Sequence, residues 1–339
     1  MPERLFGQSA IDGRILPFWR DELGISGWPG EDVFQALFNA FVGAVEISDG
    51  AAHAMRDGPV IFIANHQVAI ESLIFVFAVG GIGRRHIRAL AKQAHQTSWV
   101  GEMLGLLNAY PGQNPAPPSY FRDEYDPQSL VDMLAEMRRG LTTDGHSLLI
   151  HAEGARVLDC RRSVSQVSSV FVDLARETGV PIVPVRFANA LPVETMDNYL
   201  DFPFGFCRQT YQLGEPVTAS ALAAAHPRDR RPMVTAAINA TGVPAEEEVP
   251  TPPNTAFRRG VQEFMSETAT SQVKAVLVTA LRALAAPLPE TRRILDSLHT
   301  GSMFIGDAPA EVWLGQFCGW LSDGRTRVRR QPAHERAAI

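Results

Sequence analysis

Short apolar runs that alternate with helical patterns are the feature that most restricts the fold of this chain. Residues 60–64, 147–150 and 181–185 form such runs, and each is four or five residues long. Pro181 and Pro184 in the third run favour a strand start or an edge strand. Buried strands have this length and composition. Apolar residues at helical spacing separate the runs, as at 129–141 and 167–178. The alternation predicts an α/β fold with a mostly parallel sheet flanked by helices.

The regions on either side of this pattern have helical character. After residue 219 an alanine-rich helical pattern dominates, and an acidic, proline-rich segment at 246–253 is typical of a linker. We therefore predict an N-terminal helical segment over 1–50, an α/β domain over 51–218 and a helical C-terminal extension over 219–339. Five prolines make residues 111–127 a predicted loop or lid.

Charge and cysteine content argue against several classes of protein. A net charge of −6 disfavours a nucleic-acid-binding protein, which usually carries a basic stripe. The three cysteines are far apart in the sequence, so we expect a reducing, cytoplasmic location. The N-terminus lacks the apolar core of a secretory signal, and the longest apolar run, 73–83, is too short for a membrane span.

The first candidate site follows the run that ends at residue 64. His66 lies directly after this expected strand, where α/β folds place functional residues, and Glu71 lies at the start of the next expected helix. If the loop between them curls back, Glu71 accepts a hydrogen bond from one imidazole nitrogen and leaves the other as a base. The alternative interpretation is a surface histidine beside a helix-capping glutamate.

A second candidate site follows the run that ends at residue 150. It contains Glu153, Gly154 and Arg156. Gly154 allows the backbone to approach a ligand closely, and Arg156 can bind a phosphate through two parallel hydrogen bonds. The alternative is a strand-to-loop turn with a solvated glutamate and arginine. Because the nearby histidine, cysteine and acidic residues match no common metal-site spacing, we predict that no metal is bound.

Together these segments resemble the glycerolipid acyltransferase superfamily, which includes lysophosphatidate and glycerol-3-phosphate acyltransferases. The family motif Asn-His-x4-Asp corresponds to Asn65-His66 with Glu71, and Phe-Pro-Glu-Gly-Thr-Arg corresponds to residues 151–156. The family strand Val-Pro-Ile-Val-Pro-Val is identical to residues 180–185.

The resemblance extends over about residues 45–215, with some departures. Ala91-Lys92 stands where the family often has Ala-Lys. Glu71 replaces the usual aspartate, and its extra methylene moves the carboxylate by about 1.5 Å unless the backbone compensates. The arginine-containing second motif is not evident at 105–113, and Arg122 is a candidate substitute for its arginine.

The resemblance implies transfer of an acyl group from a coenzyme A or acyl carrier protein thioester to a hydroxyl acceptor. His66 would be the general base and Glu71 would orient it. The expected acceptor is a lysophospholipid or glycerol phosphate, as in phospholipid biosynthesis. No cofactor, metal or covalent intermediate is required. The substrate-binding residues implied in this way are Asn65, Glu153, Gly154, Arg156 and Lys92.

The sequence is compatible with several binding partners and with alternative functions. Arg85 belongs to a basic cluster at 84–88, which we predict to contact coenzyme A phosphates, an acyl carrier protein or anionic lipid; a solvated loop is the alternative. We expect peripheral membrane contact through an apolar face at 33–45, for which a core-packing helix is the alternative, or through the C-terminal helices. One alternative function is acylation of a non-glycerolipid metabolite, and another is lipid or acyl-carrier binding without catalysis.

Overall fold

A computed structural model describes residues 3–5, 11–24, 26–113, 118–123 and 125–323 of the chain. One eight-stranded sheet runs through the molecule in the order β1-β2-β8-β7-β3-β6-β4-β5. Neighbouring strands are parallel except for the pairs β1–β2 and β7–β8. The predicted mostly parallel sheet is therefore confirmed. The strands are β1 (Glu3–Leu5), β2 (Val42–Ile47), β3 (Ile61–Ala64), β4 (Ile87–Lys92), β5 (Ser119–Arg122), β6 (Ser147–His151), β7 (Ile182–Ala188) and β8 (Gln209–Leu213).

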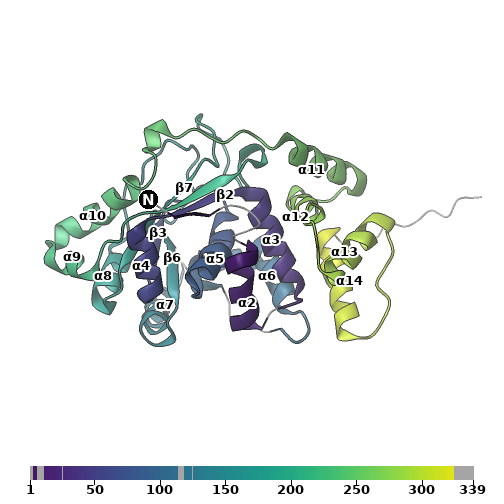
Figure 1. The fold of residues 1–339 in the computed structure, drawn as a ribbon, viewed down its shortest axis with the longest axis horizontal. Coiled ribbons are helices and arrows are strands. Elements are labelled where there is room, and N and C mark those ends of the chain that lie inside the picture. Colours follow the sequence, from purple (N-terminus) through teal and green to yellow (C-terminus); the bar gives the residue numbers. More distant parts are fainter. Residues whose placement is uncertain (1–2, 6–10, 25, 114–117, 124, 324–339) are drawn as a thin grey trace, which may run out of the picture.

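Helices cover both faces of the sheet (Figure 1). One face packs against α2 (Leu16–Leu23), α3 (Pro29–Phe41), α4 (Asp49–Asp57), α5 (Glu71–Gly83) and α6 (Trp99–Asn108). The other face packs against α7 (Pro127–Arg139), α8 (Ser169–Thr178), α9 (Ala219–Ala224) and α10 (Pro227–Asn239). In β3, Phe62 joins the first core, whereas Ile61 and Ile63 join the second. Burial on both faces explains why this strand is a continuous apolar run.

The helix α5 is apolar on nearly all sides because it lies between the sheet and the N-terminal helices. The α2 helix and the residues before it pack closely on α5. A Cβ atom added at Gly81 would lie 2.7 Å from the Cα of Ile15, so only glycine allows this approach. The first residue of α5 is Glu71, and the close packing of α5 fixes where this side chain begins.

The N-terminal part of the chain contributes to the same sheet and core. The helix α3 ends at Phe41, and β2 then pairs with β8, so a boundary at residue 51 falls after a strand of the sheet. On α3, Val33, Leu37 and Phe41 are buried, and the helix packs against α5 and α12. The face at 33–45 is therefore part of the core, and the predicted lipid contact through it is wrong.

Two further sequence predictions need correction. The proline-rich loop at 111–127 contains β5, which pairs with β4 at the sheet edge. Pro184 was expected at a strand start or edge but lies inside β7, between β3 and β8. Its carbonyl accepts from the Gly214 N–H, just beyond the β7–β8 ladder, which begins at Val185. The missing proline N–H thus removes no bond from that ladder.

The C-terminal part forms α11 (Thr255–Thr268), α12 (Gln272–Arg282), α13 (Pro289–Thr300) and α14 (Pro309–Leu321). Within the predicted helical extension, α11 ends before Ala269, which has a left-handed φ of 52°. The helix α12 packs on α3, and α14 packs on α6 (Figure 1). No helix in the described part of the chain is both long and apolar enough to cross a membrane.

Candidate active site

A cleft of about 530 Å³ opens at the edge of the sheet where the parallel strands β3, β4, β5 and β6 end. Strand register explains which residues meet there, since Ala64 pairs with His151 and Lys92 with Arg122. Side chains that follow these strands therefore converge at one edge. The lining includes His66, Ser72, Leu73, Val76, Lys92, His95, Val100, Leu104, Arg122, His151, Glu153, Gly154, Ala155 and Arg156.

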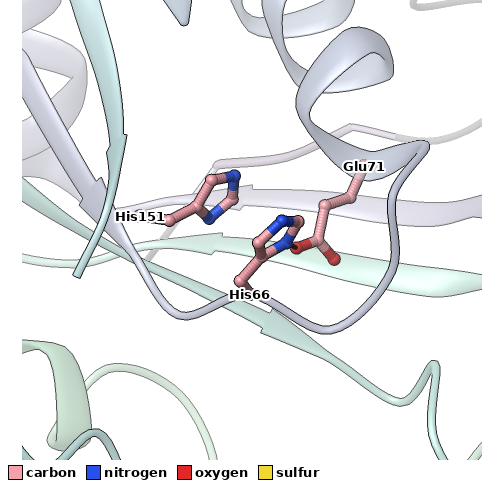
Figure 2. Close-up of side chains that lie close together, drawn as sticks. All are labelled: His66, Glu71 and His151. Carbon is pink, nitrogen blue, oxygen red and sulfur yellow. Dashed lines mark hydrogen bonds and ion pairs between the residues drawn. The ribbon is translucent and has the colours of Figure 1, made fainter. Parts of the chain in front are cut away.

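His66 and Glu71 form a hydrogen-bonded pair in this cleft (Figure 2). The distance from His66 Nδ1 to Glu71 Oε1 is 2.6 Å, so the loop between the two residues does curl back as the sequence predicts. The Glu71 side chain is fully buried, whereas His66 is 18% exposed and lines the cleft. This arrangement commits Nδ1 to Glu71 and leaves Nε2 as the nitrogen available to a substrate.

Three N–H donors hold the Glu71 carboxylate in place. The Gln67 N–H donates to Oε1 at 2.8 Å, and the Val68 N–H donates to Oε2 at 3.2 Å. The Gln209 side chain, at the start of β8, donates to Oε2 at 2.7 Å. These contacts show that the longer side chain reaches His66 without losing its support. Gln209 was not predicted, because its proximity depends on the antiparallel pairing of β8 with β7.

Burial shifts the pKa of both side chains of the pair. It lowers the pKa of His66 to about 3, helped by the positive charge of Arg156. Burial also raises the pKa of Glu71 to about 7, against the opposing effect of nearby His151 and the N–H donors. The His66 ring is thus neutral at physiological pH, which is the state that a general base needs.

His151 lies face to face with His66 (Figure 2). The ring centroids are 3.7 Å apart and the planes differ by 13°. Its Nδ1 lies 2.9 Å from the Asn65 carbonyl oxygen, and its Nε2 lies 2.7 Å from Ser72 Oγ. His151 occupies the phenylalanine position of the family motif and was not predicted to be a site residue. Its position at the end of β6, which pairs with β3 before His66, is the feature that could have identified it as a site residue.

The ligand atoms of His66, Glu71 and His151 lie within 4.8 Å of one another, close enough to consider a metal ion. The hydrogen bonds argue against this use. Each Glu71 oxygen already accepts two bonds, and both nitrogens of His151 have partners. Because the two imidazole planes are nearly parallel, their lone pairs do not converge on one point. The set fits acid–base chemistry better, and the absence of a metal stays a prediction.

Several residues predicted to bind substrate do line the cleft. The Glu153 carboxylate accepts from Ser165 Oγ at 2.5 Å. Arg156 donates to the Leu200 carbonyl at 2.6 Å and lies 3.3 Å from an Asp201 oxygen, so its guanidinium is held at the cleft wall. Lys92 and the suggested substitute Arg122 also line the cleft.

Gly154 lies in the cleft wall, and its expected close approach to a ligand stays a prediction. Its φ of 66° requires the left-handed region, which glycine adopts without strain. A Cβ atom there would meet nothing within 4 Å, so close backbone packing does not explain this glycine. Its N–H donates to the His151 carbonyl oxygen within a turn. That N–H is therefore not directed at a substrate.

Two predicted site residues lie elsewhere. The Asn65 side chain is buried and exchanges hydrogen bonds of 2.7 and 2.8 Å with the backbone of Phe187, so it joins β3 to β7. Arg85 follows the C-terminal end of α5 and donates to the Gly145 carbonyl. The thirteen-residue helix α5, about 20 Å long, lies between Arg85 and the loop of His66, and Arg85 does not line the cleft. Its contact with coenzyme A phosphates, an acyl carrier protein or anionic lipid stays a prediction.

A buried polar network supports the loop after His66. The Gln67 side chain donates to Glu248 at 2.9 Å, and the side chain of Glu248 is also paired with Arg186 at 2.7 Å. Both charged side chains are 1% exposed. The Asn189 N–H donates to the same carboxylate at 2.7 Å. The segment predicted to be a solvated linker therefore supplies a buried carboxylate that holds the residue next to His66.

Comparisons with known proteins give one family match and one similar solved structure. Residues 46–188 match the family model described as Acyltransferase. The chain is also similar to the crystal structure of the 1-acyl-sn-glycerophosphate acyltransferase PlsC from Thermotoga maritima, with 19% identity and a TM-score of 0.41. That similarity covers 62% of this chain and 74% of the other. A comparison with curated proteins finds no match.

Proposed function

Residues 46–188 form a domain of the acyltransferase family, as the sequence motifs indicate, and from this premise we propose a reaction and its residues. The chain transfers an acyl group from a coenzyme A or acyl carrier protein thioester to a hydroxyl acceptor. The observation that carries the proposal is the His66–Glu71 pair, with Nδ1 bound to a buried carboxylate and the ring lining the cleft.

In the proposed reaction, His66 Nε2 takes the proton of the acceptor hydroxyl as its oxygen attacks the acyl carbonyl. The imidazolium that forms is stabilised by Glu71, which also keeps the ring in the tautomer with Nε2 unprotonated. His66 then returns the proton to the leaving thiolate. Glu71 is fully buried and His66 is only 18% exposed, so the attraction within the developing ion pair is stronger than in water.

The cleft lining supports a phosphate-bearing acceptor and an apolar acyl chain. Lys92, Arg122 and Arg156 supply positive charge in the cleft lining. Leu73 and Leu104 supply apolar surface for the acyl chain. A lysophospholipid or glycerol phosphate carries the hydroxyl and phosphate that these groups would bind.

Reaction products measured by mass spectrometry test this proposal. Acyl thioesters of coenzyme A and of an acyl carrier protein would each be offered with lysophosphatidate, glycerol-3-phosphate and non-phosphorylated alcohols. We expect acylation of the phosphate-bearing acceptors by the native protein. Preferred acylation of the non-phosphorylated alcohols would favour a non-glycerolipid acceptor. Retained acyl ligand with no product would favour binding without catalysis.

A further inference from the structure

We propose that Ser72 and His151 form a second catalytic pair, which accepts an acyl group from the thioester onto Ser72 and hydrolyses it when no acceptor is bound. This inference rests on the proposed function only for the donor, an acyl thioester held in the same cleft. It adds an activity that the His66–Glu71 pair does not itself require.

The hydrogen bonds show which atom of the Ser72–His151 pair donates the proton. The Asn65 carbonyl can only accept, so His151 Nδ1 carries the proton of the 2.9 Å bond. His151 Nε2 then has a lone pair, and the Ser72 hydroxyl donates to it at 2.7 Å. A serine hydroxyl that donates to a histidine, itself oriented by an acceptor, is the arrangement that activates a nucleophile. Here a backbone carbonyl takes the place of the usual carboxylate.

The pair is also placed where an acyl group would lie. Ser72 and His151 both line the cleft together with His66. Ser72 is the second residue of α5, so the N–H groups and dipole of that helix stabilise negative charge developing nearby. Burial and neighbouring His66 lower the pKa of His151 to about 3, which keeps the ring neutral.

The Ser72 contact has a chemical consequence beside its structural one. The Asn65 carbonyl already fixes the plane and tautomer of His151, and stacking on His66 fixes its position. The Ser72 hydroxyl satisfies the remaining lone pair at Nε2. The same bond polarises a hydroxyl that lines the cleft.

The proposed steps balance. Ser72 Oγ attacks the thioester carbonyl, the C–S bond breaks, and the hydroxyl proton passes through His151 Nε2 to the leaving thiolate. The products are a free thiol and an ester on Ser72. Water, deprotonated by His66, then attacks this ester, the bond to Ser72 Oγ breaks, and Ser72 regains a proton. The net reaction is hydrolysis of the thioester to a carboxylic acid and a thiol.

Trapping of the ester tests the proposal. The full-length His66→Ala variant lacks the base for the second step, so incubation with palmitoyl-coenzyme A and no acceptor should give a palmitoyl adduct on the peptide that contains Ser72. The double variant His66→Ala/Ser72→Ala should give no adduct, whereas His66→Ala/Ser220→Ala, altered at an exposed serine of α9, should keep it. In the native background, Ser72→Ala should lower acceptor-free hydrolysis at least tenfold.

A fluorophosphonate probe gives a second readout that needs no acyl donor. It should label Ser72 in the native protein and in Ser220→Ala, and labelling should fall at least tenfold in His151→Asn. Absence of both the palmitoyl adduct and the fluorophosphonate label on Ser72 would overturn the proposal. If the Ser72 adduct and label were both absent while His66-dependent acyl transfer persisted, the proposed function would stand while this inference failed. Labelling of Ser72 without any acyl transfer would support this inference and contradict the proposed function.

Discussion

At the scale of single residues, the glutamate in place of aspartate at position 71 has a fully bonded carboxylate. It contacts His66 Nδ1 at 2.6 Å and also accepts from Gln67, Val68 and Gln209. A buried carboxylate needs such partners whether or not it takes part in catalysis. Under the proposed function, this geometry predicts that glutamate fits the site better than aspartate.

Glu71→Asp should therefore lower activity. Shortening the side chain by about 1.5 Å withdraws the carboxylate from His66 and from the Gln209 amide, and a misplacement of about 1 Å can cost roughly a hundredfold in rate. Initial rates of acyl transfer measure this effect, with circular dichroism as the check of folding. Activity raised by Glu71→Asp would instead support a lapsed enzyme.

His151 should make stability depend on pH. Its folded pKa lies below the ordinary 6.5, so the neutral ring contributes stability above pH 6.5, and this contribution is lost as the pH falls toward about 3. The unfolding free energy of the native protein relative to His151→Gln should fall by up to about 1.4 kcal/mol per pH unit between pH 6 and 4. Urea unfolding at several pH values measures this difference.

The matched control for that experiment is His53→Gln, at a residue whose side chain is 71% exposed. Glu71 acts in the opposite sense, because its raised pKa gives a contribution present below pH 4.5 and lost as the pH rises through about 7. Both proteins in the main comparison contain Glu71, so its contribution largely cancels. Parallel stability curves for the native protein and His151→Gln would contradict the predicted burial of a neutral ring.

At the scale of elements, local sequence patterns predict the central strands of the sheet. They miss outer strands and residues that reach the site through tertiary contacts. The strands β3, β6 and β7 and the helix α5 were predicted, since each is a continuous apolar run. The strand β2 was missed because it continues the apolar pattern of α3 without a break. The strand β5 was missed because prolines surround it. Gln209 and Glu248 reach the site only through tertiary contacts, which no local pattern contains.

The segment that supplies Glu248 should matter for catalysis as well as for stability. Glu248→Ala leaves Arg186 buried and unpaired, which should cost about 3–5 kcal/mol, and adding Arg186→Met should restore part of this. Transfer activity should stay at least tenfold low in both variants, because the Gln67 side chain loses its acceptor. Chemical unfolding and initial rates, measured on the same preparations, separate the two effects.

The control for this pair is Glu31→Gln, which breaks the contact of a buried carboxylate with Arg20 on α2, away from the cleft. It should lower stability while leaving the rate per folded molecule unchanged. Full activity in the Glu248→Ala/Arg186→Met variant would show that the network does not position the loop after His66.

At the scale of the whole molecule, the predicted membrane contact must use a surface other than the buried face of α3. Between α13 and α14, Met303 and Ile305 are 66% and 89% exposed. The helix α14 packs on α6, and α6 carries Val100 and Leu104 of the cleft lining. The C-terminal helices thus combine exposed apolar side chains with a connection to the cleft, which supports the second of the two predicted contact regions.

We expect Met303→Glu/Ile305→Glu to reduce sedimentation with phosphatidylglycerol-containing vesicles at least fivefold, because charged side chains resist transfer into the interface. Val249→Glu, at an apolar residue that is 65% exposed in a different segment, is the matched control and should bind as the native protein does. Equal binding of the double variant and the native protein would place the membrane contact elsewhere.

The most direct measurement is the rate of acyl transfer by His66→Ala beside the native protein and His53→Ala, with folding verified for all three. Loss of a positioned general base should reduce the rate by about 10²–10⁴-fold in His66→Ala, while His53→Ala, at an exposed histidine, should match the native protein. Native transfer activity that survived fully in folded His66→Ala would contradict the role of His66 as the base.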